Sequence, residues 1–416
     1  MKNIIFLLAV LLTPFAIQAK NGGDDIEISV LTCSPGEEVY SYYGHTAIRY
    51  KDPANHLDLV FNYGVFNFNT DNFIWKFVLG ETDYMCMASP WNYFIQEYKT
   101  RGSSVIAQVL NTTPEEAQNF RNFLFNNIEP KNSIYRYNFL TDNCTMRVMN
   151  CVEQCIKGQL SYSWDSTEHT YREILHEYTK AYPWAQEGND FLLGAEVDTT
   201  LSHRATCFIP DYYNKAIEHA VIRNDFQDTR KLVKSTITII EANPYVRKTS
   251  SSDNQYPLTP TQLGWIILAI GIIVVIIETL VHKVFWPLDV ILMLCHGLVG
   301  CLILFMFVFS QHPTLDSNWL ICVINPLPLI ILPYVTRSAW KKQFSLWHHF
   351  IAVWLLAFLL FTPWIPQEIS IFTILLLLCL LSRQISYLLH YSFFSSSPRK
   401  KHNSNYTNKT SRKKKK

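Results

Sequence analysis

The chain has 416 residues and a formal net charge of +2, with 36 lysines and arginines against 34 aspartates and glutamates. This balance argues against a nucleic-acid partner, which would favour a strong excess of positive charge. Hydrophobic residues make up 49% of the chain, but residues up to about 255 are mixed in polarity and those that follow are intensely apolar. The sequence therefore predicts one soluble domain followed by a membrane domain.

The first residues have the pattern of a secretory signal peptide. A positive charge comes first, residues 4–12 form a short apolar core, and Ala19 offers a small residue at the cleavage point. We therefore expect a signal at residues 1–19 that exports residues 20–245 from the cytoplasm. Ile17 departs from the small residue preferred at its position, so retention of this segment as an anchor helix is the alternative.

The pattern after the signal predicts an α+β domain, because stretches of alternating polarity are mixed with stretches of helical periodicity. Strands are expected at residues 26–31, 42–50, 57–66, 105–110 and 136–140. The second and third are joined by Lys-Asp-Pro-Ala-Asn-His, which is typical of a turn, so we expect a β-hairpin. With paired positions summing to about 107, Asn62 would lie opposite His45 and orient its imidazole.

Capping residues predict two helices in this domain. Thr113 suits the N-cap and Pro114 the first helical position of a helix that runs to about Asn127. The second helix opens at Thr141-Asp142-Asn143-Cys144 and runs to about Ile156. A cysteine in the first turn of a helix lies at the positive end of the helix dipole, which lowers the thiol pKa and favours the thiolate.

Cys144 and His45 together indicate nucleophilic catalysis, because a thiol becomes a good nucleophile when a histidine removes its proton. The alternative is that Cys144 is a buried or disulfide-bonded structural cysteine and His45 an ordinary strand histidine. An oxidising compartment permits disulfides, but cysteine spacing does not define their connectivity. The cysteines of the domain are Cys33, Cys86, Cys144, Cys151, Cys155 and Cys207.

Five apolar stretches follow a polar linker that we expect at residues 246–262. Each is about 20 residues long, the length that a helix needs to cross roughly 30 Å of hydrocarbon. They run approximately over residues 264–281, 288–309, 319–335, 346–361 and 369–389. We expect an all-α transmembrane domain of five helices at residues 263–390 and a basic cytoplasmic tail at residues 391–416.

The distribution of basic residues predicts the orientation of these spans. If the first domain is exported, an odd number of spans places the C-terminus in the cytoplasm. Lys283, Arg337 and Lys341 then fall on the cytoplasmic side, whereas the outer loops at residues 310–318 and 363–368 contain neither lysine nor arginine. This distribution satisfies the positive-inside rule.

Polar residues away from the Cys–His pair are candidate ligands for a substrate. His312, Asn318 and Asn325 lie at the outer rim of the third span, where they would bind a lipid headgroup or a second substrate. The alternative is that they are ordinary interface residues. In the exported domain, Arg204 would suit a phosphate because its fork of donors matches phosphate oxygens, with a structural role as the alternative.

The order of these motifs resembles a known group of enzymes. A histidine on a strand, a polar residue on the next strand and an Asn-Cys pair at a helix start resemble the permuted branch of the papain-like NlpC/P60 superfamily, which includes lecithin:retinol acyltransferase-like enzymes. Over nearly its whole length the chain is similar to the Lnb family of bacterial lipoprotein N-acyltransferases. The motifs that carry this resemblance are Tyr43-Gly44-His45-Thr46-Ala47, Asn62-Tyr63-Gly64, Tyr137-Asn138-Phe139, Asp142-Asn143-Cys144, Leu193-Gly194 with Asp198, His312-Pro313 and Asn325-Pro326-Leu327.

The resemblance implies a papain-like, permuted NlpC/P60-like α+β fold for the exported domain, with His45 and Cys144 as the catalytic pair. The third catalytic residue does not carry over, and Asn62 is our choice from the expected hairpin geometry. The substrate-binding residues are expected to be Asn143, Tyr43, Arg204, His312, Asn318 and Asn325. No metal and no cofactor is implied.

The resemblance further implies a lipoprotein N-acyltransferase of the bacterial inner membrane whose catalytic domain is periplasmic. An acyl chain would pass from a phospholipid ester to Cys144 as a thioester, and then to the α-amine of a diacylglyceryl-cysteine lipoprotein. The lipoprotein's own glyceryl ester is an alternative acyl donor. Two other functions stay open: a cysteine peptidase or amidase that acts on peptidoglycan or a peptide at the membrane surface, and a non-enzymatic membrane receptor or assembly factor.

Overall fold

The computed structural model describes residues 26–66, 71–164, 167–224, 228–243, 256–343 and 345–393. The expected signal peptide at residues 1–19 lies outside them. Residues 246–255 of the expected linker and residues 394–416 of the expected tail also lie outside the described residues.

The described residues form two compact units, an α/β unit and a helical unit, as the sequence predicts. The α/β unit contains the described chain up to Thr259 together with Phe305–Trp319 and Pro366–Glu368. The helical unit contains Pro260–Leu304, Leu320–Ile365 and the described residues from Ile369 onward. Two short segments that connect apolar helices in the sequence are therefore part of the α/β unit.

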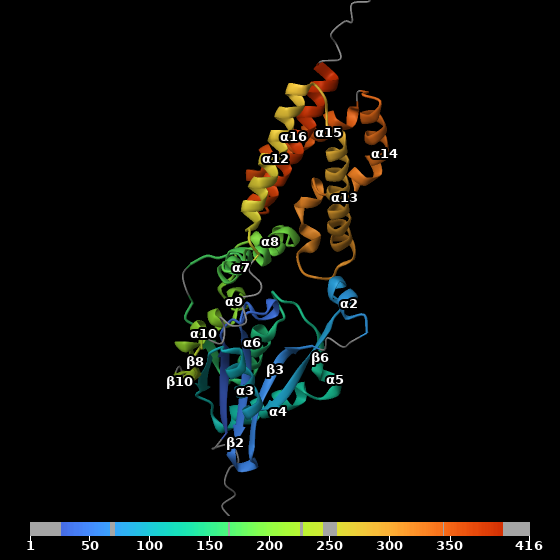
Figure 1. The fold of residues 1–416 in the computed structure, drawn as a ribbon. Helices are drawn as coiled ribbons and strands as arrows, with labels where there is room; N and C mark the ends of the chain where they lie inside the picture. Colours follow the sequence, from blue (N-terminus) through green and yellow to red (C-terminus); the bar gives the residue numbers. More distant parts are fainter. Residues whose placement is uncertain are drawn as a thin grey trace, which may run out of the picture. The chain divides into compact units, whose positions relative to one another are not determined.

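A seven-stranded antiparallel sheet of order β10-β5-β1-β2-β3-β4-β6 organises the α/β unit (Figure 1). Its strands are β1 (Glu27–Cys33), β2 (His45–Asp52), β3 (Leu57–Val65), β4 (Asp83–Pro90), β5 (Val105–Leu110), β6 (Ile134–Arg136) and β10 (Val233–Ile240). A smaller sheet of order β7-β8-β9 is built from β7 (Gln159–Ser161), β8 (Val221–Arg223) and β9 (Thr229–Lys231).

Helices cover both faces of the large sheet. Successive side chains of a strand point to opposite sides, so the strands present apolar residues to a core on each face. Ile28 and Val30 of β1 belong to a core shared with α4 and α6, whereas Leu31 and Cys33 pack with Phe94 of α3. The α-helices of this unit are α2 (Phe73–Leu79), α3 (Trp91–Arg101), α4 (Pro114–Asn127), α5 (Pro130–Ser133), α6 (Cys144–Cys155), α7 (Tyr171–Thr179), α8 (Pro183–Leu192), α9 (His203–Thr206) and α10 (Pro210–Glu218). Its short 3-10 turns are η1 (Val39–Ser41), η2 (Pro53–Asn55), η3 (Ala195–Asp198) and η4 (Leu315–Ser317).

The predicted hairpin is confirmed, but its register differs from the expected one. Asn62 of β3 pairs with Ala47 of β2 and not with His45. A shift of two residues keeps Asn62 on the face of the sheet that carries His45, because side chains alternate with a period of two. β2 begins at His45, later than predicted, because η1 and Gly44, with a φ of 79°, turn the chain before it.

The predicted strand at residues 136–140 is wrong, since β6 ends at Arg136. Asn138 Oδ1 accepts hydrogen bonds from the backbone N–H groups of Leu140 at 3.0 Å and Thr141 at 3.1 Å. An asparagine side chain that binds the backbone just after it favours a turn over a strand. This turn leads into α6, which packs against β2.

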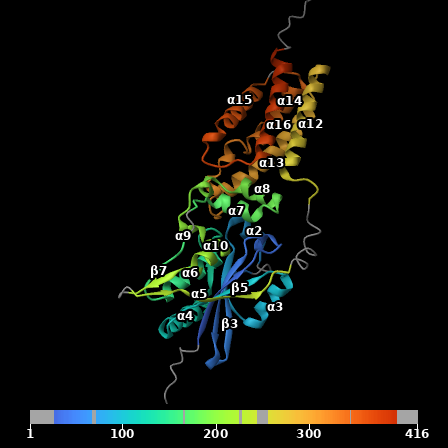
Figure 2. The same ribbon diagram turned by 90° about the vertical axis from the view of Figure 1, so that its left-hand side faces the viewer.

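Five helices in the described residues are long and apolar enough to cross a membrane, as predicted (Figures 1 and 2). Their α-helical segments are α12 (Pro260–Val281), α13 (Trp286–Phe309), α14 (Leu327–Trp340), α15 (Leu346–Phe361) and α16 (Ile371–Leu388), with η6 (Thr362–Trp364) after α15 and a π-turn, η7 (Leu389–Phe393), after α16. The third span is discontinuous, because η5 (Trp319–Cys322) is separated from α14. Pro326 and Pro328 suit the first turn of α14 but cannot continue a helix from η5, since proline lacks a backbone N–H.

α12 and α16 pack closely along one another in the helical unit. A Cβ atom added to Gly271 of α12 would lie 2.7 Å from Cys379 Sγ of α16. Small residues of this kind let two membrane helices approach at backbone distance.

A buried ionic cluster also joins α12, α13 and α16. Arg383 donates to both carboxylate oxygens of Glu278, at 2.7 and 2.8 Å, and to Asp289 Oδ1 at 2.8 Å. All three side chains are buried. One arginine therefore pairs with two carboxylates in a buried place, where an unpaired charge is costly.

Arg383→Met is expected to lower the free energy of unfolding by about 3–5 kcal/mol, because it leaves two carboxylates buried without a counter-charge. The midpoint of thermal unfolding in detergent measures this loss. Arg337→Met, at an exposed position of α14, is the matched control and should shift the midpoint far less. Equal midpoints for the two variants would contradict the structural role of the cluster.

Candidate active site

Cys144 is the first residue of α6, as the sequence predicts, and it is 8% exposed. Asn143 is the N-cap, with Oδ1 accepting the backbone N–H of Met146 at 3.0 Å. Its amide nitrogen donates to the carbonyl oxygens of Phe139 at 2.9 Å and Phe208 at 2.8 Å. Because backbone groups occupy both ends of this amide, Asn143 holds the start of the helix that carries Cys144.

His45 and Asn62 meet beside this helix start. His45 Nε2 and Asn62 Oδ1 are 3.2 Å apart, and Asn62 Nδ2 donates to Ser89 Oγ at 3.3 Å and to the Val60 carbonyl at 3.4 Å. A carbonyl oxygen on Nε2 favours the tautomer with a proton on that nitrogen. Nδ1 is then the nitrogen left for the Cys144 thiol, with which the imidazole shares a hydrogen bond.

The surroundings of Cys144 favour its thiolate at neutral pH. Burial of the thiol would raise its pKa, but the charge of His45 and hydrogen bonds from His45 and the Thr46 backbone N–H outweigh burial and lower the pKa to about 7. Burial of His45 would lower the imidazole pKa, but the charge of Cys144 and hydrogen bonds with Cys144 and Asn62 raise it. The two groups therefore stabilise each other as a thiolate–imidazolium pair. Thr46 Oγ1 and Thr145 Oγ1, 3.1 Å apart, join β2 to α6 beside the pair.

Four other cysteines of the α/β unit have pKa values shifted in the opposite direction. Burial raises the pKa of the Cys86 and Cys207 thiols to about 12, and it raises the pKa of Cys33 and Cys151 further. All ten cysteines of the chain lie within the described residues, and all are free thiols. Cys144 therefore differs from these four in the direction of its pKa shift.

Tyr137 lies next to the thiol, and our site prediction missed it. Its hydroxyl accepts a hydrogen bond from the backbone N–H of Cys144, while its ring stacks on Tyr84 with centroids 4.5 Å apart. A Cβ atom at Gly64 would lie 3.0 Å from the Tyr137 ring, so glycine gives this ring its room. The available signal was the motif Tyr137-Asn138-Phe139, from which we assigned no role.

Arg204 is already paired, away from the thiol. Its guanidinium donates to Glu153 Oε2 at 2.8 Å and contacts Asn150, both on α6. Glu153 follows Cys144 by nine residues, which corresponds to roughly 13 Å along a helix axis. In this structure Arg204 therefore braces the far half of α6 with its guanidinium.

Tyr43 contacts α8 with its hydroxyl group. Its hydroxyl accepts a hydrogen bond from Asn189 Nδ2 at 2.9 Å, and its ring lies 6.3 Å from that of Tyr178. Burial raises the pKa of the Tyr43 hydroxyl to about 12. Tyr43 thus links the residues before β2 to α7 and α8.

His312 belongs to a segment that caps α2. The last carbonyl groups of a helix have no partner within it, and here residues 310–312 provide three donors. His312 Nε2 donates to Phe77 O at 2.6 Å, Ser310 Oγ to Val78 O at 2.9 Å, and the Gln311 backbone N–H to Leu79 O at 2.7 Å. The segment therefore stabilises the C-terminus of α2.

Asn318 joins the same outer segment to the end of α8. Its amide nitrogen donates to the carbonyl oxygens of Phe191 at 2.9 Å and Leu192 at 3.0 Å. The backbone N–H of Gly194 donates to Thr314 O at 3.1 Å. Gly194, part of a motif quoted above, thus lies where two backbones approach closely.

A buried arginine holds the residues around this contact. Arg172 pairs with Asp190 at 2.8 Å and with Asp198 at 2.7 Å. Asp198 also accepts the backbone N–H of Glu368 at 3.2 Å, and Gln367 Nε2 donates to the Leu193 carbonyl at 3.2 Å. Both segments that connect apolar helices therefore bind to the region of α8 and η3.

Gly194→Ala is expected to loosen this attachment, because a Cβ atom there would lie 2.5 Å from the backbone nitrogen of Asn318. Amide hydrogen exchange in residues 314–318 should become faster. Gly188→Ala, in α8, is the control, since a Cβ atom there meets nothing within 4 Å. Unchanged exchange in both variants would refute the close approach.

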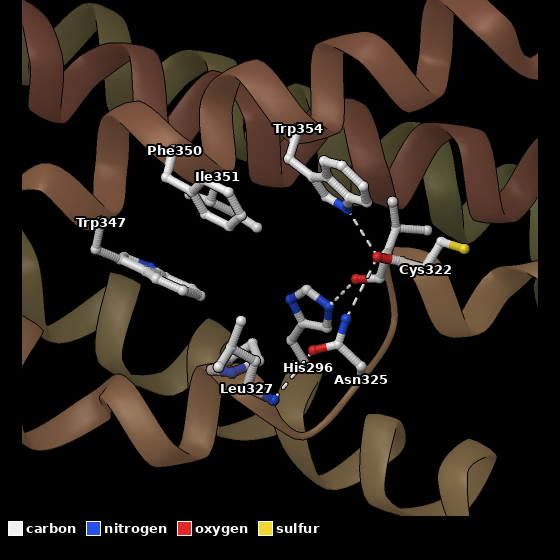
Figure 3. A pocket seen from close by; sticks show the side chains of 10 residues that line it. His296, Cys322, Asn325, Leu327, Trp347, Phe350, Ile351 and Trp354 are labelled. Atoms are coloured by element: carbon white, nitrogen blue, oxygen red, sulfur yellow. Dashed lines mark hydrogen bonds between the residues drawn. The ribbon is translucent and has the colours of Figure 1, made fainter.

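Asn325 lies in the helical unit, at the break in the third span. Its amide nitrogen donates to Cys322 O at 3.3 Å, and the break is further satisfied by His296 Nε2, 2.7 Å from Val323 O, and by Trp354 Nε1, 2.8 Å from Cys322 O. These groups border a cavity of about 160 Å³. Figure 3 shows His296, Asn325 and Trp354 beside it. The cavity is lined by His296, Cys322, Val323, Asn325, Leu327, Pro328, Trp347, Phe350, Ile351 and Trp354. Side chains thus replace the hydrogen bonds that the broken helix lacks.

The predicted site residues fall into separate groups. His45, Asn62 and Cys144 come together, and Asn143 holds the helix that carries the thiol. Tyr43, Arg204, His312, Asn318 and Asn325 use their polar side-chain groups in contacts within the protein.

Comparison with protein families gives two matches along the chain. The Lnb N-terminal periplasmic domain matches residues 15–179, and the Lnb transmembrane domain matches residues 251–393. Searches of curated proteins and of solved structures gave no match. The first match includes the His45–Asn62–Cys144 cluster, and the second includes the five candidate spans. With the periplasmic and transmembrane domains of one family following each other in a single polypeptide, the chain belongs to the Lnb family of multi-pass membrane proteins.

Proposed function

We propose that this protein is a lipoprotein N-acyltransferase with Cys144 as its nucleophile. The observation that carries the proposal is the Cys144 thiol, whose pKa is lowered to about 7 beside a histidine bound to Asn62. A thiolate that forms at neutral pH in a periplasmic domain is suited to covalent acyl transfer.

In the first half-reaction, the Cys144 thiolate attacks the ester carbonyl of a phospholipid. A carbon–sulfur bond forms, the ester carbon–oxygen bond breaks, and the His45 imidazolium gives its proton to the departing lysophospholipid oxygen. Asn62 keeps the imidazole oriented through Nε2. The products are a lysophospholipid and an acyl thioester on Cys144.

In the second half-reaction, the free α-amine of a diacylglyceryl-cysteine lipoprotein attacks the thioester. A carbon–nitrogen bond forms, the carbon–sulfur bond breaks, and neutral His45 accepts the proton of the amine. The amide product leaves, and the thiolate–imidazolium pair is restored. The lipoprotein's own glyceryl ester would serve equally as acyl donor by the same steps.

Both half-reactions pass through a tetrahedral oxyanion that needs hydrogen-bond donors. The backbone N–H of Cys144 lies at the start of α6, and the Tyr137 hydroxyl is bonded to it. Because that N–H donates to the Tyr137 oxygen, we assign the Tyr137 hydroxyl proton to the oxyanion, since donors placed before the reaction stabilise developing charge most effectively.

The membrane spans support a lipid substrate. Both an acyl donor and a lipidated acceptor reside in the bilayer, so the enzyme must be held there. We place the protein in the bacterial inner membrane with the α/β unit in the periplasm and the C-terminus in the cytoplasm, because the basic residues then follow the positive-inside rule.

Expression in a strain whose resident lipoprotein N-acyltransferase can be depleted tests the proposal. Mass spectrometry of a reporter lipoprotein should find an N-acylated terminal cysteine. A diacyl form with a free amine would refute the proposed reaction. A peptidase or amidase with the same thiol would instead cleave labelled peptidoglycan fragments, and a receptor would keep its cellular role without Cys144.

A further inference from the structure

A continuous line of aromatic rings connects α2 with the thiol. Starting from α2, the ring centroids of Phe77 and Phe73 are 6.1 Å apart, and those of Phe73 and Phe66 are 5.9 Å apart. Phe66 then lies 5.3 Å from Tyr84. These are distances at which aromatic rings touch, so the rings form one surface.

The line ends at the reacting atoms. Tyr84 stacks on Tyr137 at 4.5 Å, and the Tyr137 hydroxyl binds the backbone N–H of Cys144. We call Phe77, Phe73, Phe66, Tyr84 and Tyr137 the aromatic path.

The aromatic path is distinct from the two cores described above. Its rings belong to neither of the two cores that cover the faces of the large sheet. At the α2 end the path is open, since Phe77 is 47% exposed and its neighbours Ile74 and Trp75 are 78% and 56% exposed. Apolar surface of this extent on an exported domain indicates a binding partner.

The open end of the path is connected to the edge of a membrane span. Residues 310–312, which cap α2, follow directly after the last residue of α13, Phe309. Trp75 also packs on Phe305 of α13 with ring centroids 5.3 Å apart. α2 thus binds residues that lie where the chain leaves the hydrocarbon, and exposed tryptophan and phenylalanine are typical of that boundary.

We propose that the aromatic path binds the fatty acyl chain that is transferred, along its course from the bilayer to Cys144. This inference rests on the proposed acyltransferase function and adds where the chain lies. An acyl chain lifted from the bilayer would otherwise expose its methylene groups to water, at about 0.8 kcal/mol each. The rings replace that lipid contact, and a bound chain would shield the thioester from hydrolysis.

Acylation of Cys144 by activated esters of different length tests the inference on the full-length protein in lipid nanodiscs. With 4-nitrophenyl palmitate, Phe73→Ala and Phe66→Ala should each lower the acylation rate about tenfold or more, since several methylenes lose contact and each is worth up to about fourfold. With 4-nitrophenyl butyrate, the same variants should stay within about twofold of the unmodified protein, because a short chain does not reach these rings.

Tyr93→Ala is the matched control, because Tyr93 is 70% exposed on α3 and lies outside the aromatic path. It should leave both rates unchanged. Equal losses with the two esters, or no loss with palmitate, would overturn the inference. Failure of the proposed function is seen separately, as unchanged acylation of the protein by both esters after Cys144→Ala.

A measurement on the unmodified protein covers the case in which a variant does not fold. A phospholipid with a diazirine in its acyl chain should label peptides that contain Phe66, Tyr84 or residues 73–77 upon illumination. Labelling confined to the membrane helices would overturn the inference as well.

Discussion

Cys144→Ala is expected to abolish N-acylation, with a loss in rate on the order of 10⁴-fold or more, as for other enzymes that lose their nucleophile. No other group in the described site replaces the thiol, since His45 and Asn62 act on it and Tyr137 binds its backbone. The measurement is the N-terminal lipid structure of a reporter lipoprotein, together with the acyl thioester on the enzyme. Neutral hydroxylamine should release that acyl group from the unmodified protein.

Cys151→Ala is the matched control for this variant. Cys151 lies on the same helix, is buried, and has a thiol whose pKa burial raises. Its replacement should leave both the thioester and the N-acyl product in place. N-acylated lipoprotein from the Cys144→Ala variant would show that another group carries the acyl chain.

His45→Ala is expected to raise the pKa of the Cys144 thiol from about 7 to above 9.0, its ordinary value, because burial is then opposed only by the weaker hydrogen bonds. The unmodified protein holds about half of the thiol as thiolate at pH 7, and the variant about one per cent or less. Alkylation of Cys144 by iodoacetamide should therefore slow about 50-fold at pH 7. The two proteins should approach the same rate at high pH, where both thiols are ionised.

The pH at half-maximal alkylation is the quantity to compare, and His219→Ala provides the control at an exposed position. Asn62→Ala should give an intermediate shift, because the imidazole remains but loses its partner on Nε2. A midpoint near pH 7 in the His45→Ala variant would mean that the histidine does not set the thiol pKa.

Local sequence signals predict the elements that carry Cys144 and His45 well. Cys144 begins a helix because Asn143 is a strong N-cap, and His45 lies in a hairpin whose turn residues are unmistakable. The register of the hairpin was off by two residues, but the period of two keeps Asn62 within reach of His45. Local signals therefore predict these elements, whereas the pairing of His45 with Cys144, far away in the sequence, was implied by the family resemblance.

Long-range contacts explain most of what the sequence could not predict. His312 and Asn318 look like exposed ligands in the sequence, yet their partners Phe77 and Phe191 are more than 100 residues away. Arg204 likewise pairs with Glu153, which is 51 residues away in the sequence. Backbone carbonyls carry no side-chain signal, so a polar residue that binds them cannot be distinguished from one that awaits a substrate.

The third membrane span gives a related lesson. The sequence predicts a span at residues 319–335, but the structure has η5, a break and α14. The prolines at residues 326 and 328 were visible in the sequence, whereas the donors from His296 and Trp354 that make a break tolerable were not. Glu278 and its partner Arg383 are 105 residues apart in the sequence, so their pairing was not visible in the sequence either.

The assignment of Phe305–Trp319 and Pro366–Glu368 to the α/β unit has a consequence for biogenesis and for preparing the protein. The α/β unit is complete only after translation has passed Glu368. Its folding can therefore be completed only after the apolar helices that precede Glu368 have been synthesised. A secreted fragment truncated at Thr259 would lack residues 310–312, which donate hydrogen bonds to the last carbonyl groups of α2. It would also lack Thr314, whose carbonyl accepts the backbone N–H of Gly194. Assays should therefore use the intact polypeptide, since such a fragment would lack these contacts even when its thiol is correctly placed.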